Sequence, residues 1–145
     1  MASYNKFNIF CYDLCSGYHK LGAADDVVKV YLAATATSPG AETDAVKADI
    51  TEFAGGTGYT AGGSDVQNTL SRSTATTTMA STDVVWTAGA ADWNAFQFVV
   101  AYNSSHTTPG PNLPLISWWD YGSALTLGNT ETFTVDWGAS FFTIS

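Results

Sequence analysis

The sequence predicts a mostly β chain: a single-domain antiparallel β-sandwich or jelly-roll-like fold with a short N-terminal helix. Three observations support this fold class. Apolar and polar residues alternate with a period of two in several segments, those segments are rich in β-branched and aromatic residues, and turns containing glycine or proline separate them. A chain of 145 residues is long enough for one domain with a sizeable core. We therefore expect one domain over residues 1–145, with the helix at about 3–16 and a β-rich body at about 18–145.

The N-terminal segment is the one part of the chain that we expect to be helical. Apolar residues recur there at positions i, i+3, i+4 and i+7, namely Phe7, Phe10, Cys11 and Leu14. Ser3 is a candidate N-cap, and Gly17 is well placed to end the helix. Alternation over residues 7–11 leaves a strand as the alternative.

Residues 27–37 and 95–103 have the strongest strand signals. In the first segment Val28, Val30 and Leu32 share one face of an extended chain. The second segment, AFQFVVAYN, is apolar on both faces. A strand of that kind lies at the centre of a sheet or at an interface.

The middle of the chain gives weaker signals. Residues 46–54 fit a short helical or irregular segment better than an edge strand. Residues 66–79 are rich in Thr and Ser and fit an exposed strand or extended loop, and residues 83–87 fit a short strand. The loop at residues 104–114 contains three of the four prolines and is long for a hairpin connection, so we expect it on the surface.

Residues 55–63, GGTGYTAGG, contain five glycines around Tyr59. A phosphate-binding loop would need Gly-Lys-Ser/Thr at the start of a helix, or GxGxxG between a strand and a helix, and neither pattern is present. We expect a flexible or tightly turned connection. The alternative is an arm that becomes ordered on contact with a neighbouring copy.

The stretch from residue 114 to residue 137 contains three of the five tryptophans and is expected to close the β fold. Adjacent residues of a strand point to opposite faces, so Trp118 and Trp119 do not share a face. One is expected in the core, and the other on the outer face or at an interface. Two alternating runs follow, and Gly128-Asn129 between them favours a tight hairpin turn. The apolar face of the second run contains Phe133, Val135 and Trp137.

The charge balance argues against several kinds of partner. Charged residues make up 12% of the chain, below the roughly 25% of an average domain, and the net charge is −8. The five basic residues are too few to neutralise nucleic-acid phosphates or an anionic membrane surface. No apolar run approaches the roughly 20 residues that cross a bilayer, and the N-terminus has no signal-peptide pattern. We therefore expect no nucleic acid, no membrane and synthesis in the cytoplasm.

Cys11 and Cys15 are the only cysteines. On a strand their Cα atoms would lie about 13 Å apart, which is too far for a disulfide. On a helix they would lie on adjacent turns, where a bridge would be strained and would constrain little. We expect two free, buried thiols, in keeping with a reducing compartment.

No motif in the sequence indicates an enzymatic reaction. A zinc site needs three or four ligands at a suitable spacing. Cys11, Cys15 and His19 could align on one helical face, but Gly17 interrupts that helix, so we expect no metal and no cofactor. The nucleophile-elbow pattern GxSxG is absent. We expect no catalytic residue and no enzymatic activity.

Asp120 and Asp136 flank the tryptophans, an arrangement similar to a glycosidase cleft with two carboxylates and aromatic sugar platforms. The simpler interpretation is that both face outward from strands and discourage edge pairing. Aromatic side chains could also bind sugar without catalysis, with Trp93, Trp118 and Tyr121 as candidates. Core or subunit-interface positions explain the same residues. The residues that we assign to an interface are Trp118, Trp119, Tyr121, Trp93 and Tyr59.

Three segments resemble a group of small virion-associated proteins of tailed bacteriophages. They are MASYNKFNIFCYDLCSGYHKLG at the N-terminus, ADITEFAGGTGYTAGG in the middle and LISWWDYGSALTLGNTETFTVDW near the C-terminus. The segments occur in the same order and the resemblance covers most of the chain, although residues 67–81 add little to it. Within this group, the chain resembles head proteins of the capsid decoration or cement type.

The resemblance implies a structural role in a bacteriophage virion. A decoration protein binds the outside of the head and clamps neighbouring major capsid proteins. The implied partners are the major capsid protein and copies of the chain itself, as a homotrimer, and the implied location is the capsid surface after synthesis in the host cytoplasm. No catalytic residue is transferred. The alternatives are a phage tail or fibre component, or a carbohydrate-binding module that acts in host adsorption.

Overall fold

The computed structural model describes residues 3–36 and 38–145, and its class is the predicted one: mostly β, sandwich-like, with one short N-terminal helix. The elements in chain order are β1 Ser3–Lys6, α1 Ile9–Cys15, β2 Val28–Ala34, the 3-10 turn η1 Lys47–Asp49, β3 Ser64–Asp65, β4 Thr69–Ser73, β5 Thr76–Ala80, β6 Val84–Thr87, β7 Phe96–Asn103, β8 Leu115–Leu125, β9 Thr132–Val135 and β10 Phe142–Ile144.

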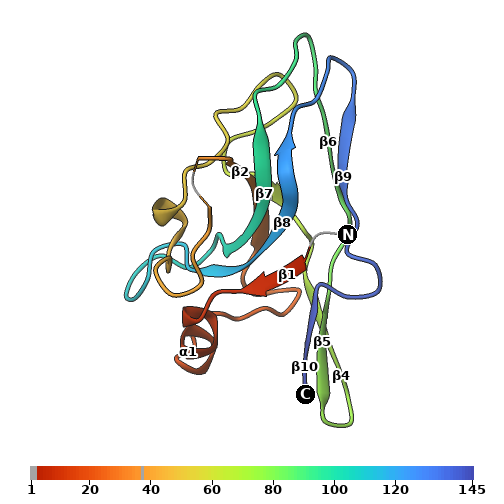
Figure 1. The fold of residues 1–145 in the computed structure, drawn as a ribbon. Coiled ribbons are helices and arrows are strands. Elements are labelled where there is room, and N and C mark those ends of the chain that lie inside the picture. Colours follow the sequence, from red (N-terminus) through yellow and green to blue (C-terminus); the bar gives the residue numbers. More distant parts are fainter. Residues whose placement is uncertain (1–2, 37) are drawn as a thin grey trace.

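The strands form three antiparallel sheets. A five-stranded sheet has the order β1-β8-β7-β2-β3, a three-stranded sheet the order β10-β5-β4, and a two-stranded sheet pairs β6 with β9. The three-stranded sheet projects below the rest of the molecule, and the chain ends on it (Figure 1). We call this projection, β4, β5 and β10, the arm.

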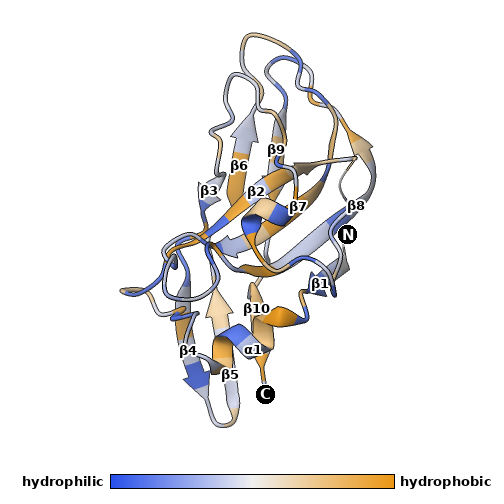
Figure 2. Cartoon of the chain, turned by 90° about the vertical axis from the view of Figure 1, so that its left-hand side faces the viewer, coloured by the Kyte–Doolittle hydropathy of each residue, from blue (hydrophilic) through white to orange (hydrophobic). Residues whose placement is uncertain are grey.

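The central strand of the large sheet is β7, which lies between β8 and β2 as its two apolar faces predict. Alternation along β2 divides its side chains between two core clusters. Val28, Val30 and Leu32 belong to one cluster, and Tyr31 and Ala33 belong to the other. Figure 2 shows β2 and β7 mainly in the apolar colour, whereas β4 of the arm mixes apolar, pale and polar colours. The five-stranded sheet is therefore covered on both faces.

The expectation of one helix over residues 3–16 is wrong in its first half. Residues 3–6 form the edge strand β1, which pairs with β8 and places Tyr4 opposite Trp119. The helix begins only at Ile9. Its predicted end is confirmed: Gly17 has a φ of +79° and donates its N–H to the Leu14 carbonyl, in a glycine-terminated helix end. Residues 3–6 therefore pair with the edge of the large sheet instead of extending the helix.

The predicted hairpin at Gly128-Asn129 is also wrong. A turn does form there, because the N–H of Glu131 donates to the carbonyl oxygen of Gly128 at 2.9 Å. However, β8 pairs with β7 and β1, whereas β9 pairs with β6. The register of β6 and β9 sets Trp86 opposite Phe133, with stacked rings. Apolar cross-strand pairs of this kind stabilise the pairing of β9 with β6, which is distant in sequence, over a hairpin with β8.

The glycine-rich segment at residues 55–63 is the tightly turned connection that the sequence favours. A Cβ atom on Gly58 would collide with the Thr87 carbonyl oxygen, and one on Gly63 with the Val30 carbonyl oxygen. Both glycines also have positive φ angles. Contacts within the chain therefore order the segment, without a neighbouring copy. The short helical or irregular segment predicted at residues 46–54 agrees with η1 at residues 47–49. The exposed strand or extended loop predicted at residues 66–79 agrees with the β4–β5 hairpin.

Candidate functional site

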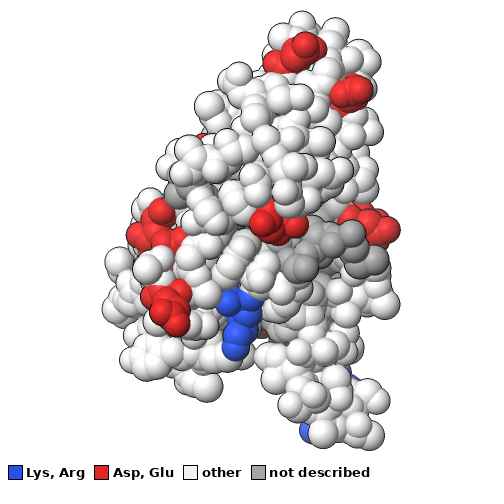
Figure 3. Space-filling view, viewed as in Figure 1, with Lys and Arg blue, Asp and Glu red and all other residues white. Residues whose placement is uncertain are grey.

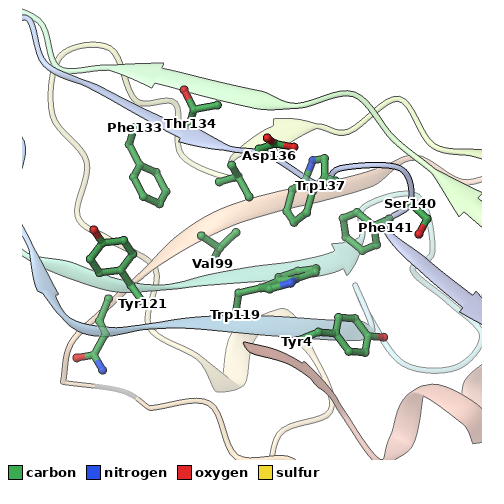
Figure 4. Close-up of a pocket in the computed structure, with 12 residues that line it drawn as sticks. Tyr4, Val99, Trp119, Tyr121, Phe133, Thr134, Asp136, Trp137, Ser140 and Phe141 are labelled. Atoms are coloured by element: carbon green, nitrogen blue, oxygen red, sulfur yellow. The ribbon is translucent and has the colours of Figure 1, made fainter. Parts of the chain in front are cut away.

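An open aromatic cleft of about 520 Å³ lies between the large sheet and the segment that contains β9 (Figure 4). It lies where these two parts of the fold separate, because β9 is hydrogen-bonded to β6 and not to β8. Val99 of β7 lies between the aromatic groups in Figure 4. The lining residues are Tyr4, Gln97, Val99, Trp119, Tyr121, Phe133, Thr134, Val135, Asp136, Trp137, Ser140 and Phe141.

Aromatic rings form both ends of this cleft. At one end the Trp119 ring centroid is 4.7 Å from that of Trp137 and 5.0 Å from that of Phe141. The Trp137 indole is held by its Nε1–H, which donates to the Thr82 carbonyl oxygen at 3.0 Å. At the other end Tyr121 and Phe133 are in edge contact. The rings are thus fixed by their neighbours before any ligand arrives.

Polar groups lie along the walls of the cleft. Asp136 is the only acidic residue among the described lining residues, and one of its carboxylate oxygens accepts the Gly138 N–H at 2.7 Å. The Gln97 amide is oriented by donating to Asp120 at 2.9 Å. Tyr4 is 42% exposed, and the partial burial of its phenol raises the pKa above its usual value. Among the described lining residues, Asp136 is therefore the one acidic side chain, and none is basic.

The structure separates the five residues that the sequence assigns to an interface. Trp93 and Trp118 are buried in the core, 3% and 9% exposed, so the chain itself covers them. Tyr59 is half-buried, and its hydroxyl group is hydrogen-bonded within the chain. Trp119 and Tyr121 line the cleft, and Tyr121 is 54% exposed. The surface side chains of the original set are therefore the two in the cleft.

The predicted placement of Trp118 and Trp119 on opposite faces of the strand is confirmed, and both rings pack against a core cluster. Trp118 packs on Phe7 in one core cluster, with ring centroids 4.5 Å apart, and Trp119 packs against the other cluster. The sequence did not identify Tyr4, Gln97 or Phe141 as site residues. No local pattern could have found them, because four segments distant in sequence meet at the cleft.

A second groove of about 700 Å³ runs between α1 and β10 and shares Tyr4, Ser140 and Phe141 with the cleft. Cys11 and Cys15 line it. Both thiols are free, as expected, but they are exposed, so the prediction that they are buried is wrong. The helix is only seven residues long and turns other side chains, Phe10 among them, toward the core.

A carboxylate network fixes the glycine-rich segment to the large sheet. The Glu52 carboxylate accepts hydrogen bonds from the Tyr59 hydroxyl at 2.8 Å and the Gly62 N–H at 2.6 Å, and its other oxygen pairs with Lys47 Nζ at 2.6 Å. Burial, together with the Glu52 charge, raises the pKa of Tyr102 to about 12. The same two causes raise the pKa of Tyr59 further. This cluster is saturated by its own bonds and serves the fold.

A second polar cluster lies between α1 and the loop at residues 104–114. Asn103, fully buried, donates to the Tyr18 carbonyl at 3.0 Å and to the Asp26 carboxylate at 2.7 Å, and lies 3.4 Å from His19 Nδ1. The His19 Nε2 has no protein partner within the described chain. Burial lowers the pKa of His19 to about 4, against an opposing effect of the Asp26 charge.

The buried His19 is expected to make the protein acid-sensitive. Its folded-state pKa is below the ordinary value near 6.5, so the unfolded chain takes up the proton first as the pH falls. The contribution of neutral His19 to the free energy of unfolding is fully present above about pH 7 and is lost as the pH falls toward about 4. The loss is about 2 kcal/mol between pH 8 and pH 5. The neighbouring Asp13 carboxyl has a pKa raised by burial and acts in the opposite direction. Urea unfolding at pH 8 and pH 5 measures this loss for the wild type and for His19→Gln. The variant should lose less stability than the wild type, by about the amount assigned to His19. If both proteins lose the same amount, His19 is not the cause of the acid sensitivity.

Metal and membrane sites are not evident in the described part of the chain. No three His, Cys, Asp or Glu residues among residues 3–36 and 38–145 are grouped so that they could hold a metal ion. Within the same ranges no helix is long and apolar enough to cross a bilayer. Of the two candidate glycosidase carboxylates, Asp136 lines the cleft, but Asp120 does not and is bonded to Gln97 and Gly122.

Comparison of the chain with models of protein families, with curated proteins and with solved structures found no match.

Proposed function

We propose that the protein is a structural component of a bacteriophage virion, a capsid decoration protein that binds the head surface and clamps neighbouring major capsid proteins. The observation that carries this proposal is the surface: a projecting arm and an open aromatic cleft on a chain with few charges. Exposed contact surfaces of this kind suit binding to other proteins. We also propose that the protein is not an enzyme, since the sequence contains no catalytic motif such as the nucleophile elbow GxSxG.

The segments that carry the phage resemblance support the proposal by their positions. The N-terminal segment supplies β1, and the C-terminal one supplies β8, its pairing partner. The middle segment contains Glu52 and the glycines that pack against β2 and β6. The resemblance therefore falls on parts of the chain that determine the fold together.

Decoration stabilises a capsid by mass action. A protein that binds the assembled shell and not its dissociated subunits shifts the balance toward the shell. Each copy would bury about 1,000 Å² or more against its neighbours. We expect the partners to be the major capsid protein and other copies of the chain, as a homotrimer, on the capsid surface, after synthesis in the host cytoplasm.

Quantitative mass spectrometry of purified virions tests this function. A decoration protein is expected at a copy number comparable with that of the major capsid protein. A few copies per particle would instead indicate the tail or fibre alternative. Absence from the particle would contradict a virion role altogether.

Carbohydrate binding is the second candidate, because the cleft offers aromatic faces beside polar groups. Of the three sugar-binding candidates from the sequence, Trp93 and Trp118 are covered by the core, and Tyr121 remains exposed. Titration with a panel of glycans should quench tryptophan fluorescence through Trp119 and Trp137, and Tyr121→Ala should weaken that response. A flat response across the panel would exclude this candidate.

A further inference from the structure

The arm differs in charge from the rest of the molecule. Residues 67–82 and 138–145, which build it, contain a single charged side chain, Arg72, the only arginine in the chain. Since the whole chain carries −8, the remainder carries −9. Figure 3 shows acidic side chains distributed over the body and none on the arm in this view. A contact between two bodies therefore opposes like charges, and a contact between an arm and a body does not.

Arg72 lies among exposed apolar side chains. The antiparallel registers place Arg72 opposite Thr77, and Thr77 opposite Ile144, so these three side chains share one face of the arm. Leu70, two residues from Arg72, lies on the same face. Leu70 and Ile144 are 43% and 44% exposed. This face of the arm combines one guanidinium group with apolar surface.

The aromatic cleft has the complementary chemistry. A guanidinium group stacks on aromatic faces and pairs with carboxylates. The cleft presents several fixed rings, including Trp119 and Trp137. Asp136, the one charged side chain among its described lining residues, is acidic and exposed. Such a lining suits a cationic side chain with apolar neighbours.

We propose that the arm of one copy docks into the aromatic cleft of a second copy, with the Arg72 guanidinium against the rings and beside Asp136. The described residues include six large exposed apolar side chains, and four of these belong to the arm or the cleft. Leu70 and Ile144 lie on the arm, and Tyr4 and Tyr121 line the cleft. The contact joins two different surfaces, so repetition closes a ring or extends into a filament. The inference deepens the self-association expected under the proposed function.

A charge exchange tests this contact. The oligomeric state is measured by sedimentation and by light scattering over a range of concentrations. Wild-type protein is expected to associate, and Arg72→Glu and Asp136→Arg are each expected to weaken association by about tenfold or more. The combination of the two is expected to restore much of it, because the ion pair is re-formed with reversed signs. High salt should weaken the wild-type contact.

Matched controls separate this contact from general effects. Lys20→Glu makes the same change in net charge at an exposed residue of the body, and Val85→Ala trims an exposed apolar side chain outside both surfaces. Neither should change the association. Asp136→Asn keeps an oxygen for the Gly138 N–H and should still weaken binding, which tests the charge without disturbing the turn. Circular dichroism confirms that each variant is folded.

The outcomes are distinct. A wild-type protein that stays monomeric at all concentrations would overturn the proposal, and so would an oligomer that Arg72→Glu leaves intact or that the charge exchange fails to restore. The readout is independent of the virion test. If the protein is monomeric in solution but present at high copy number on particles, the proposed arm contact is wrong and the virion role stands. If it forms the arm-linked oligomer but is absent from particles, the virion role is wrong and the arm contact stands.

Discussion

Trp118→Ala is expected to lower the free energy of unfolding by about 3–5 kcal/mol, the range for large-to-small changes at a buried aromatic residue. Trp118 is 9% exposed and belongs to the core cluster that contains Phe7, Tyr31 and Phe98. Its removal leaves a cavity under the five-stranded sheet. For a domain of typical stability, about 5–15 kcal/mol, such a loss is a large share of the total. Urea unfolding followed by circular dichroism measures it.

Trp119→Ala is the matched comparison, since the two residues are adjacent on β8 and lie on opposite faces. Trp119 is half-buried and lines the open cleft, so its truncation is expected to cost less, about 2 kcal/mol. It removes a ring from the surface that we assign to self-association. The expected pattern is a folding defect in Trp118→Ala and an association defect in Trp119→Ala. Equal losses of stability with unchanged association would contradict the interface assignment of Trp119.

The period-two pattern of the sequence predicted side-chain directions better than strand partners. Directions are local, because they follow from the geometry of an extended chain, and the opposite placement of Trp118 and Trp119 and the burial of β7 on both faces agree with the prediction. Partners are non-local. The sequence places residues 3–6 in the helix because Ser3 is a candidate N-cap, but their pairing with β8 fixes them as a strand.

The cleft was beyond prediction for the same reason. Its walls come from β1, β7, β8 and the segment around β9, and their relative positions depend on how the sheets pack. Sequence spacing carries no information about that packing. Asp136 and Trp137 were noted in the sequence as members of one alternating run, but only the fold places them beside Tyr4 and Trp119.

Glu52→Ala is expected to lower the free energy of unfolding by about 3 kcal/mol, near the lower end for removal of one partner of a buried ion pair. The pair is mostly buried, with Lys47 and Glu52 side chains 20% and 17% exposed, so solvent reduces the effect from its maximum. The change leaves Lys47 Nζ, the Tyr59 hydroxyl and the Gly62 N–H without their common acceptor. Donors that lose a partner in a buried site carry a desolvation cost.

Two further variants divide the role of Glu52 into its parts. Glu52→Gln keeps an oxygen for Tyr59 and Gly62 but removes the charge opposite Lys47, so its loss should lie between those of wild type and Glu52→Ala. Tyr59→Phe removes the hydroxyl that donates to Glu52 and accepts the Leu32 N–H, at an expected cost of about 1–2 kcal/mol. Glu42→Ala, at an exposed position, is the control and should change stability by less than about 0.5 kcal/mol.

The combination of Glu52→Ala and Tyr59→Phe should cost less than the sum of the two separate changes, because both remove the same hydrogen bond. Strict additivity would mean that the two residues act independently and would contradict the shared network. Because the bonds of Glu52 fix residues 59–62 against β2, the variants should also increase hydrogen exchange at Gly62 and Gly63 before the large sheet opens. A segment whose exchange stayed as slow as in wild type would instead be held by the glycine contacts alone.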